Sequence, residues 1–174
     1  MGAWGAIIMS FFGAAFAALT LYWQYGVADF TLVVPFFVFV AIGLAALHVL
    51  RRPGVGLVPC PRAERVLMWA SIGEGVGLFL AGNIVMNLHR PEWLLPAMAL
   101  VVGLHFLPIA WAAHFRPYFL LGAALVLAAI AGFSVPAPLG GTVAGLMAAL
   151  ALWTAALLAV GRDWLAKAGS ASAA

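Results

Sequence analysis

Two ionisable residues, Glu74 and His105, lie deep inside apolar segments of this 174-residue chain. Glu74 is near the middle of the hydrophobic stretch 66–88, which is long enough to cross a membrane. An acidic side chain at the centre of a spanning helix costs about 2.5–3.5 kcal/mol. Such residues usually face other protein groups or a water-filled cavity and mark functional sites. The chemistry expected of Glu74 is therefore the binding of a proton or a cation.

His105 is expected at the same depth as Glu74. The chain turns between their two segments near Arg90, which follows Glu74 by sixteen residues and precedes His105 by fifteen. At a helical rise of about 1.5 Å per residue, both side chains lie roughly 23 Å from the turn. Antiparallel neighbouring helices would then hold the acid and the imidazole at one level, where they can share a proton or form an ion pair.

The residues near Glu74 are small, and Ser71 adds a hydroxyl group about one turn away. Gly73 and Gly75 would leave room for water or a ligand beside the carboxyl group. Gly73 and Gly77 also form a G-x-x-x-G pair, which permits close approach of another helix. The pair predicts that this helix is the packing centre of the bundle.

His105 is flanked by Gly103 and by Pro108, which removes a backbone hydrogen bond and is expected to kink the helix near the site. A lone histidine inside a membrane can also be an ordinary core residue. Asn83 and Asn87 share one face of the Glu74 helix, but Asn83 is about half a turn out of phase with Glu74. Both asparagines are candidates for lining a vestibule or for hydrogen bonds between helices.

The sequence lacks the residue patterns of several common catalytic, phosphate-binding and metal sites. No G-x-S-x-G, H-E-x-x-H or G-x-x-x-x-G-K pattern occurs. A deep histidine pair for haem is missing, and Glu74 with His105 is too sparse a ligand set for zinc. Cys60, the only cysteine, is interpreted as a loop thiol. We therefore expect no metal and no cofactor.

Composition identifies the solvent of this chain as lipid. Hydrophobic residues make up 67% and charged residues 7%, against about 25% charged residues in soluble domains. The mean hydropathy is +1.16. These values predict an all-α integral membrane protein with a single domain over residues 1–168 and a disordered tail at 169–174. No basic stripe or aromatic pattern for binding nucleic acid is present.

Six stretches are long and apolar enough to span a membrane. They cover residues 3–24, 31–50, 65–88, 93–114, 117–134 and 139–161. Six spans place seven of the eight Lys and Arg residues on one side and only Arg90 on the other. The positive-inside rule then puts both termini in the cytoplasm. Asp29 is expected to cap the start of the second helix.

A weak internal repeat suggests three related helical hairpins, formed by helices 1–2, 3–4 and 5–6. Each even-numbered helix has a proline followed seven or eight residues later by Gly-Leu. The pairs are Pro35 and Gly43, Pro96 and Gly103, and Pro138 and Gly145. In the odd-numbered helices, Glu74 takes the place held by Ala14 and Ala123. The repeat would make the central hairpin the specialised one.

Two functional hypotheses follow. The first is a small transporter or channel-like protein for a proton or a small solute, with Glu74 as the titrating group and His105 as its partner. The alternative is a non-catalytic membrane subunit or assembly partner, in which Glu74 serves as polar glue between helices. An enzyme is disfavoured because no nucleophile lies at the depth of these two residues.

Composition also bears on location and partners. The Ala-, Gly- and Leu-rich chain contains a single lysine, which favours a multi-pass protein of a bacterial inner (plasma) membrane. Besides the lipid bilayer, a homo-oligomer or a membrane partner subunit remains compatible with the sequence.

Overall fold

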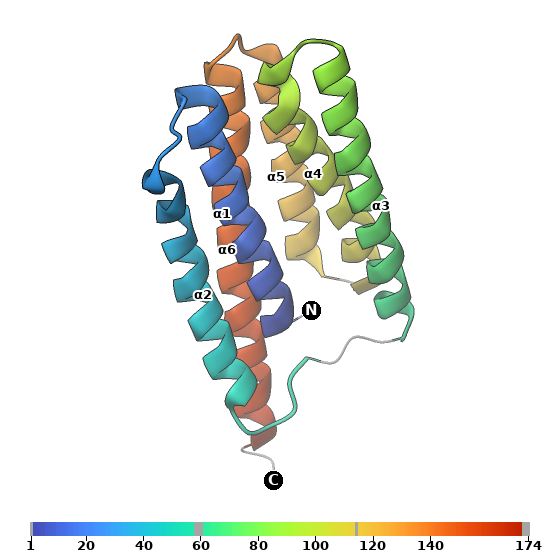
Figure 1. The fold of residues 1–174 in the computed structure, drawn as a ribbon. Coiled ribbons are helices and arrows are strands. Elements are labelled where there is room, and N and C mark those ends of the chain that lie inside the picture. The colour runs from blue at the N-terminus through green and yellow to red at the C-terminus, as the bar shows by residue number, and fades with distance from the viewer. Residues whose placement is uncertain (1, 58–60, 114, 172–174) are drawn as a thin grey trace.

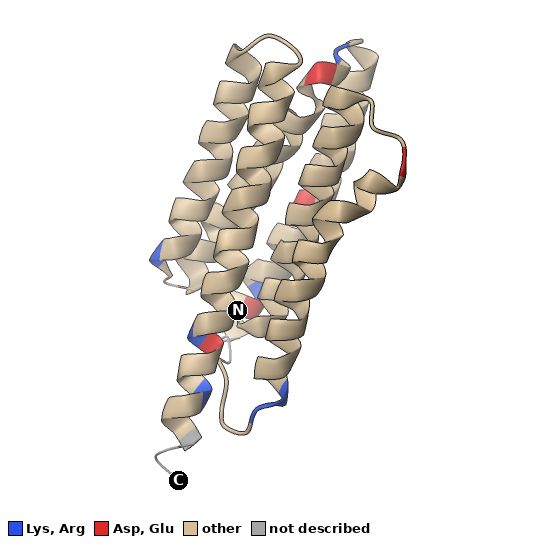
Figure 2. Ribbon diagram, turned by 90° about the vertical axis from the view of Figure 1, so that its left-hand side faces the viewer, with Lys and Arg blue, Asp and Glu red and all other residues tan. Residues whose placement is uncertain are grey.

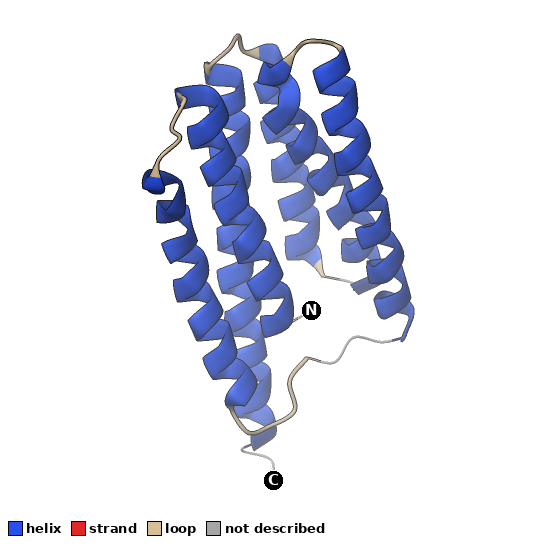
Figure 3. Cartoon of the chain, in the orientation of Figure 1, coloured by secondary structure: helices blue, strands red, loops and turns tan. Residues whose placement is uncertain are grey.

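The computed structural model describes residues 2–57, 61–113 and 115–171, and every element in these ranges is a helix (Figures 1 and 3). Six helices are long and apolar enough to cross a membrane, as predicted. They are α1 (Ala3–Tyr25), α2 (Val34–Arg51), α3 (Pro61–Asn87), α4 (Leu94–Ala113), α5 (Arg116–Ser134) and α6 (Leu139–Ala171). Short 3-10 helices, η1 (Phe30–Val33) and η2 (Pro91–Trp93), precede α2 and α4.

The largest boundary difference is at α6, which continues ten residues beyond the predicted end at 161. Hydropathy ends the predicted span at Arg162, but Asp163 and Lys167 are both buried in the folded chain. The helix therefore continues as a packed element. Residues 169–171, predicted to belong to the tail, are helical, whereas 172–174 lie outside the described residues.

Local signals explain several helix ends. Asp29 caps η1 as expected, because its Oδ1 accepts a hydrogen bond from the Thr31 N–H at 2.8 Å. Hydrogen bonding by Thr31 also holds the pKa of Asp29 below its usual value. At the end of α1, Gly26 adopts a left-handed conformation with φ 65°. The N–H groups of Gly26 and Val27 then bond back to the carbonyls of Tyr22 and Leu21.

The hydrophobic core lies mainly among α1, α4, α5 and α6. Helix α2 packs on the outside of α1 and α6, and α3 packs on α4 at the opposite edge (Figure 1). Fully buried large side chains include Phe16, Leu95, Tyr118, Leu125 and Leu152.

The prediction that the Glu74 helix is the packing centre is wrong. Val85 is the one buried residue of α3, and the helix exposes large apolar side chains such as Trp69 and Phe79, which are 63% and 70% accessible. Exposed apolar surface costs little in lipid, so a spanning helix need not be enclosed by protein. No substantial packing joins α3 to α1 or α2 in the described part of the chain.

Both chain termini lie at one end of the bundle, here called the terminal side (Figure 1). The basic residues gather toward that side (Figure 2), whereas Arg90 lies at the opposite end, in the connection between α3 and η2. Helix α4 of the second hairpin packs on α5 of the third, and α6 of the third packs on α1 of the first. Among the described residues, no substantial contact joins α2 of the first hairpin to α3 of the second, as a closed threefold arrangement would require. The threefold repeat and the orientation in the membrane therefore stay predictions.

Candidate functional site

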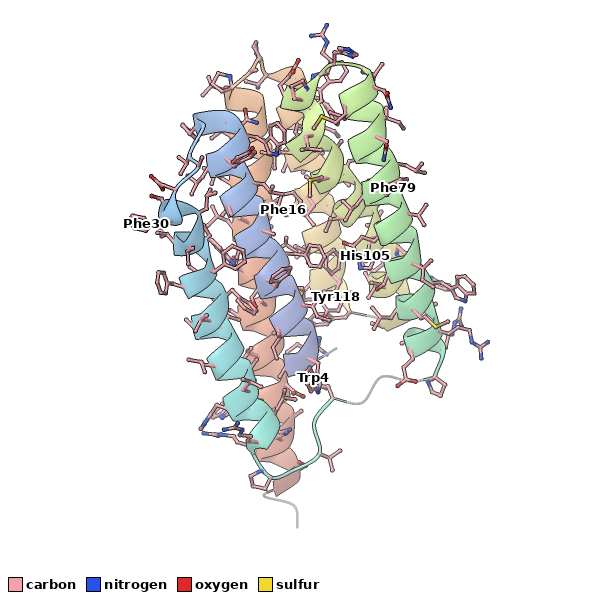
Figure 4. The ribbon with its side chains drawn as sticks, viewed as in Figure 1. Trp4, Phe16, Phe30, Phe79, His105 and Tyr118 are labelled. Atoms are coloured by element: carbon pink, nitrogen blue, oxygen red, sulfur yellow. The ribbon has the colours of Figure 1, made fainter. Side chains whose placement is uncertain are left out.

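Glu74 and His105 meet at the contact between α3 and α4. Their Oε2 and Nδ1 atoms are 3.6 Å apart, and their side chains are 13% and 7% exposed. The contact predicted from the equal depth of these two residues is therefore present in the structure. Figure 4 shows His105 directed into the interior of the bundle, toward the space between α1 and α3.

Gly77 lets α3 approach α4 close to Glu74. A Cβ atom at Gly77 would lie 2.8 Å from Cγ1 of Val101, too near for any larger residue without a shift. Gly73 and Gly75, by contrast, face open space. The G-x-x-x-G pair is therefore not used as a pair within the chain, because only its second glycine lies in a helix contact.

The imidazole of His105 has an unmet hydrogen-bonding capacity. Nδ1 is buried and lacks a hydrogen-bond partner among the described residues. Its distance from the Glu74 carboxyl group exceeds that of an ordinary hydrogen bond, about 2.7–3.2 Å. A small cavity of about 30 Å³ adjoins both residues, between α1, α3, α4 and α6. This volume is sufficient for one water molecule in contact with both polar groups.

A larger pocket of about 310 Å³ leads from the pair toward the terminal side. Helix α1 forms one wall, α3 and α4 form the other, and Leu57 of the α2–α3 connection contributes at the end. The pocket is mostly apolar, and Ser71, Glu74 and His105 are the polar side chains that line it. Trp4 lies at the terminal-side end of the wall formed by α1 (Figure 4).

Of the other polar residues predicted for the site, Ser71 lies in the pocket, whereas Asn83 and Asn87 are not among its lining residues. Ser71 joins Glu74 in the pocket lining. The amide of Asn83 donates to the Phe79 carbonyl and that of Asn87 donates to the Asn83 carbonyl, both within α3. Both asparagine side chains are thus exposed and bound to their own helix.

Gly103 and Pro108 do not pack around the carboxyl group. A Cβ atom at Gly103 would lie 3.0 Å from the carbonyl oxygen of Gly122, so this glycine serves the contact of α4 with α5. Helix α4 continues through Pro108, whose side chain is exposed.

Helix α1 also contributes to the site, which the sequence did not predict. Ile8 and Met9 line both cavities beside the ionisable pair. These are ordinary apolar residues of a spanning helix, and no pattern in the sequence distinguishes them. Only the packing of α1 against the rest of the bundle reveals their position.

A second polar cluster, formed by Asp163 and Lys167, was also missed. Oδ2 of Asp163 accepts from the N–H of Ala3 at 3.2 Å, and Oδ1 accepts from the N–H of Leu57 at 2.8 Å. Nζ of Lys167 donates to three carbonyl groups at the end of α2. An acid at the start of α1 and a cation at the end of α2 both complement the helix dipoles. This cluster joins three helices on the terminal side.

No group of three or more His, Cys, Asp or Glu side chains that could hold a metal occurs in the described ranges. Cys60 and His114 lie outside them. The chemistry that this geometry allows is proton exchange or recognition of a cation or hydrogen-bond donor at Glu74 and His105.

A model of a family of unknown function, DUF7010, matches residues 67–161. The match covers more than half of the chain and includes both Glu74 and His105. Neither the curated proteins nor the solved structures contain a significant match.

Proposed function

We propose that this chain, which belongs to the DUF7010 family of unknown function, is a small transporter or channel-like protein that handles a proton or a small solute. The observation that carries the proposal is the Glu74–His105 pair, almost enclosed at the inner end of a pocket. Ionisable residues inside a membrane are costly and mark ion or solute pathways by default.

Glu74 is the titrating group in this proposal. It exchanges a proton, or binds a cationic or hydrogen-bond-donating part of the solute. His105 accepts the proton or stabilises the carboxylate, and a water in the small cavity can bridge the two groups. Ser71 supplies a further hydrogen-bonding group on the same wall.

The pocket reaches Glu74 from the terminal side. Beyond the pair, Phe12, Val102 and Leu152 line the small cavity with apolar groups. Among the described residues, α3 packs substantially on α4 and on no other long helix, so its movement relative to α1 breaks few contacts. We infer that a shift of α3 along its contact with α4 changes access to Glu74.

The test is transport by the purified chain in liposomes. Proton uptake is followed with an entrapped pH indicator, and solute uptake with a panel of small organic cations and neutral solutes. Glu74→Gln is expected to abolish the flux that the native chain shows. Glu64→Gln is the matched control, because Glu64 lies on the same helix and is exposed. Equal flux in the native chain and in Glu74→Gln would sink the proposal.

The second candidate is a non-catalytic membrane subunit. It is favoured by the largely uncovered surface of α3, on which a partner helix would find apolar side chains and open glycines. In that case Glu74→Gln weakens folding or partner retention and leaves every flux unchanged. Size-exclusion chromatography of both variants in mild detergent separates the two outcomes.

We further propose that both termini face the cytoplasm of a bacterium and that the chain resides in its plasma membrane. The support is the gathering of basic residues on the terminal side (Figure 2). Labelling of single cysteines placed at Arg90 and Arg116, in chains whose native Cys60 is replaced by serine, tests the orientation. Only the cysteine at position 90 is expected to react from outside the cell.

A further inference from the structure

A second apolar groove lies between α5 and α6. It has a volume of about 360 Å³. Small side chains form its floor, and larger ones form its rims. The floor includes Ala124, Ala151 and Ala155, and the rims include Leu120, Leu150 and Leu158. Leu120 is 72% exposed and Leu150 is 56% exposed, so the groove faces the surroundings of the bundle rather than its core.

The length of the groove matches one leaflet of a bilayer. Along α6 it extends from Leu158 on the terminal side to Met147, eleven residues away. At a rise of about 1.5 Å per residue, this distance is roughly 16 Å. Half of a bilayer's hydrocarbon core is about 15 Å thick. An extended acyl chain from the terminal-side leaflet therefore fits along the whole groove.

Positive charge lies at the terminal-side end of the groove. Arg162 follows Leu158 by one helical turn, and its guanidinium carbon lies 3.5 Å from the ring centroid of Phe115, a lining residue. A guanidinium group stacked on a ring keeps its N–H groups in the plane, where they suit a phosphate. Arg116 lies next to Phe115 and is exposed. Positive charge thus meets the groove where a lipid phosphate would lie.

We propose that the α5–α6 groove binds a phospholipid with a net negative headgroup from the terminal-side leaflet. The acyl chain lies over the alanine floor, and Arg162 binds the phosphate with help from Arg116. The site is separate from the Glu74–His105 pocket, which shares no lining residue with it.

The test uses the purified full chain in phosphatidylcholine vesicles with traces of spin-labelled phosphatidylglycerol or phosphatidylcholine. Electron paramagnetic resonance measures the motionally restricted fraction of each label. We expect the native chain to prefer phosphatidylglycerol by about fivefold, the effect of roughly one arginine near a membrane surface. Arg162→Gln should remove most of this preference, and Arg162→Lys should keep much of it.

Thr154→Trp provides an independent variant, because Thr154 is an exposed lining residue and a large ring there fills the groove. It should lower the restricted fraction of both labels. Arg90→Gln, which removes the one basic residue away from the terminal side, is the control and should leave both readouts unchanged. The proposal is overturned if the native chain holds both labels equally. It is also overturned if Arg162→Gln and Thr154→Trp both behave like the native chain.

Discussion

Lys167 offers the sharpest test of how the terminal side is held together. Its Nζ atom donates to the carbonyl oxygens of Val49, Leu50 and Arg52 at 3.0, 2.9 and 3.2 Å. The residue is 8% exposed. Lys167→Met keeps an unbranched side chain and removes the ammonium group, so three carbonyl groups at the end of α2 lose this donor. The Val49 carbonyl still accepts from the N–H of Arg52.

The expected loss follows from these contacts. A hydrogen bond to a charged group contributes about 1.5–3 kcal/mol, and a cation at a helix C-terminus adds about 0.3–1 kcal/mol. The three bonds share one ammonium group and do not add fully, and removing a buried charge recovers part of its desolvation cost. We expect the free energy of unfolding to fall by about 2–4 kcal/mol, which lowers the Tm of a chain of this size by roughly 4–16 °C.

Thermal unfolding in mild detergent, followed by circular dichroism, measures this loss. Arg51→Met is the matched control, because Arg51 is an exposed cation at the end of α2, the helix end that Lys167 contacts. Its effect should stay within about 0.5 kcal/mol. Lys167→Arg should fall between the native chain and Lys167→Met, since a planar guanidinium group cannot reach three converging carbonyls equally well. If Lys167→Met is as stable as Arg51→Met, the reasoning about this cluster is refuted.

Three further outcomes are expected. Asp163→Ala should cost about 2–4 kcal/mol in the same assay, because the N–H groups of Ala3 and Leu57 lose their acceptor; stability within about 0.5 kcal/mol of the native chain would contradict this. Gly103→Val should cost about 1–3 kcal/mol by forcing α4 from α5, whereas Gly82→Ala, which meets open space in α3, should be neutral or stabilising. The lowered pKa of Asp29 means that its cap stabilises η1 above the usual aspartate pKa and is lost as pH falls through the lowered value. The protection of the Thr31 amide against hydrogen exchange, taken relative to its intrinsic rate at each pH, should fall as pH drops through that lowered value. Asp29→Asn should remove this pH dependence.

Hydropathy and helix geometry together located the Glu74–His105 contact. The six spans could be predicted because a lipid solvent requires about 20 apolar residues per helix. The contact could be predicted because two helices joined by a short turn lie side by side. Equal spacing from that turn then matches the depth of Glu74 and His105. Both features are independent of how the hairpins pack on one another.

The position of α3 at the edge of the bundle could not be predicted from hydropathy and helix geometry. In water, burial separates apolar from polar faces, whereas in lipid both the packed and the exposed faces of a helix are apolar. The exposed Trp69 and Phe79 therefore look the same in the sequence as buried residues. The continuation of α6 past Arg162 also could not be predicted from the sequence. Asp163 and Lys167 look like solvated residues until the ends of α1 and α2 are placed beside them.

The sequence by itself determined that this is a six-helix membrane protein with Glu74 and His105 at one depth. Chain connectivity and the thickness of the bilayer impose both results. Tertiary structure alone decided that α1 closes the pocket beside this pair, that α3 stays at the edge of the bundle, and that Asp163 and Lys167 are buried. These features depend on contacts between hairpins, and hydrophobicity cannot encode those contacts where every helix face is apolar.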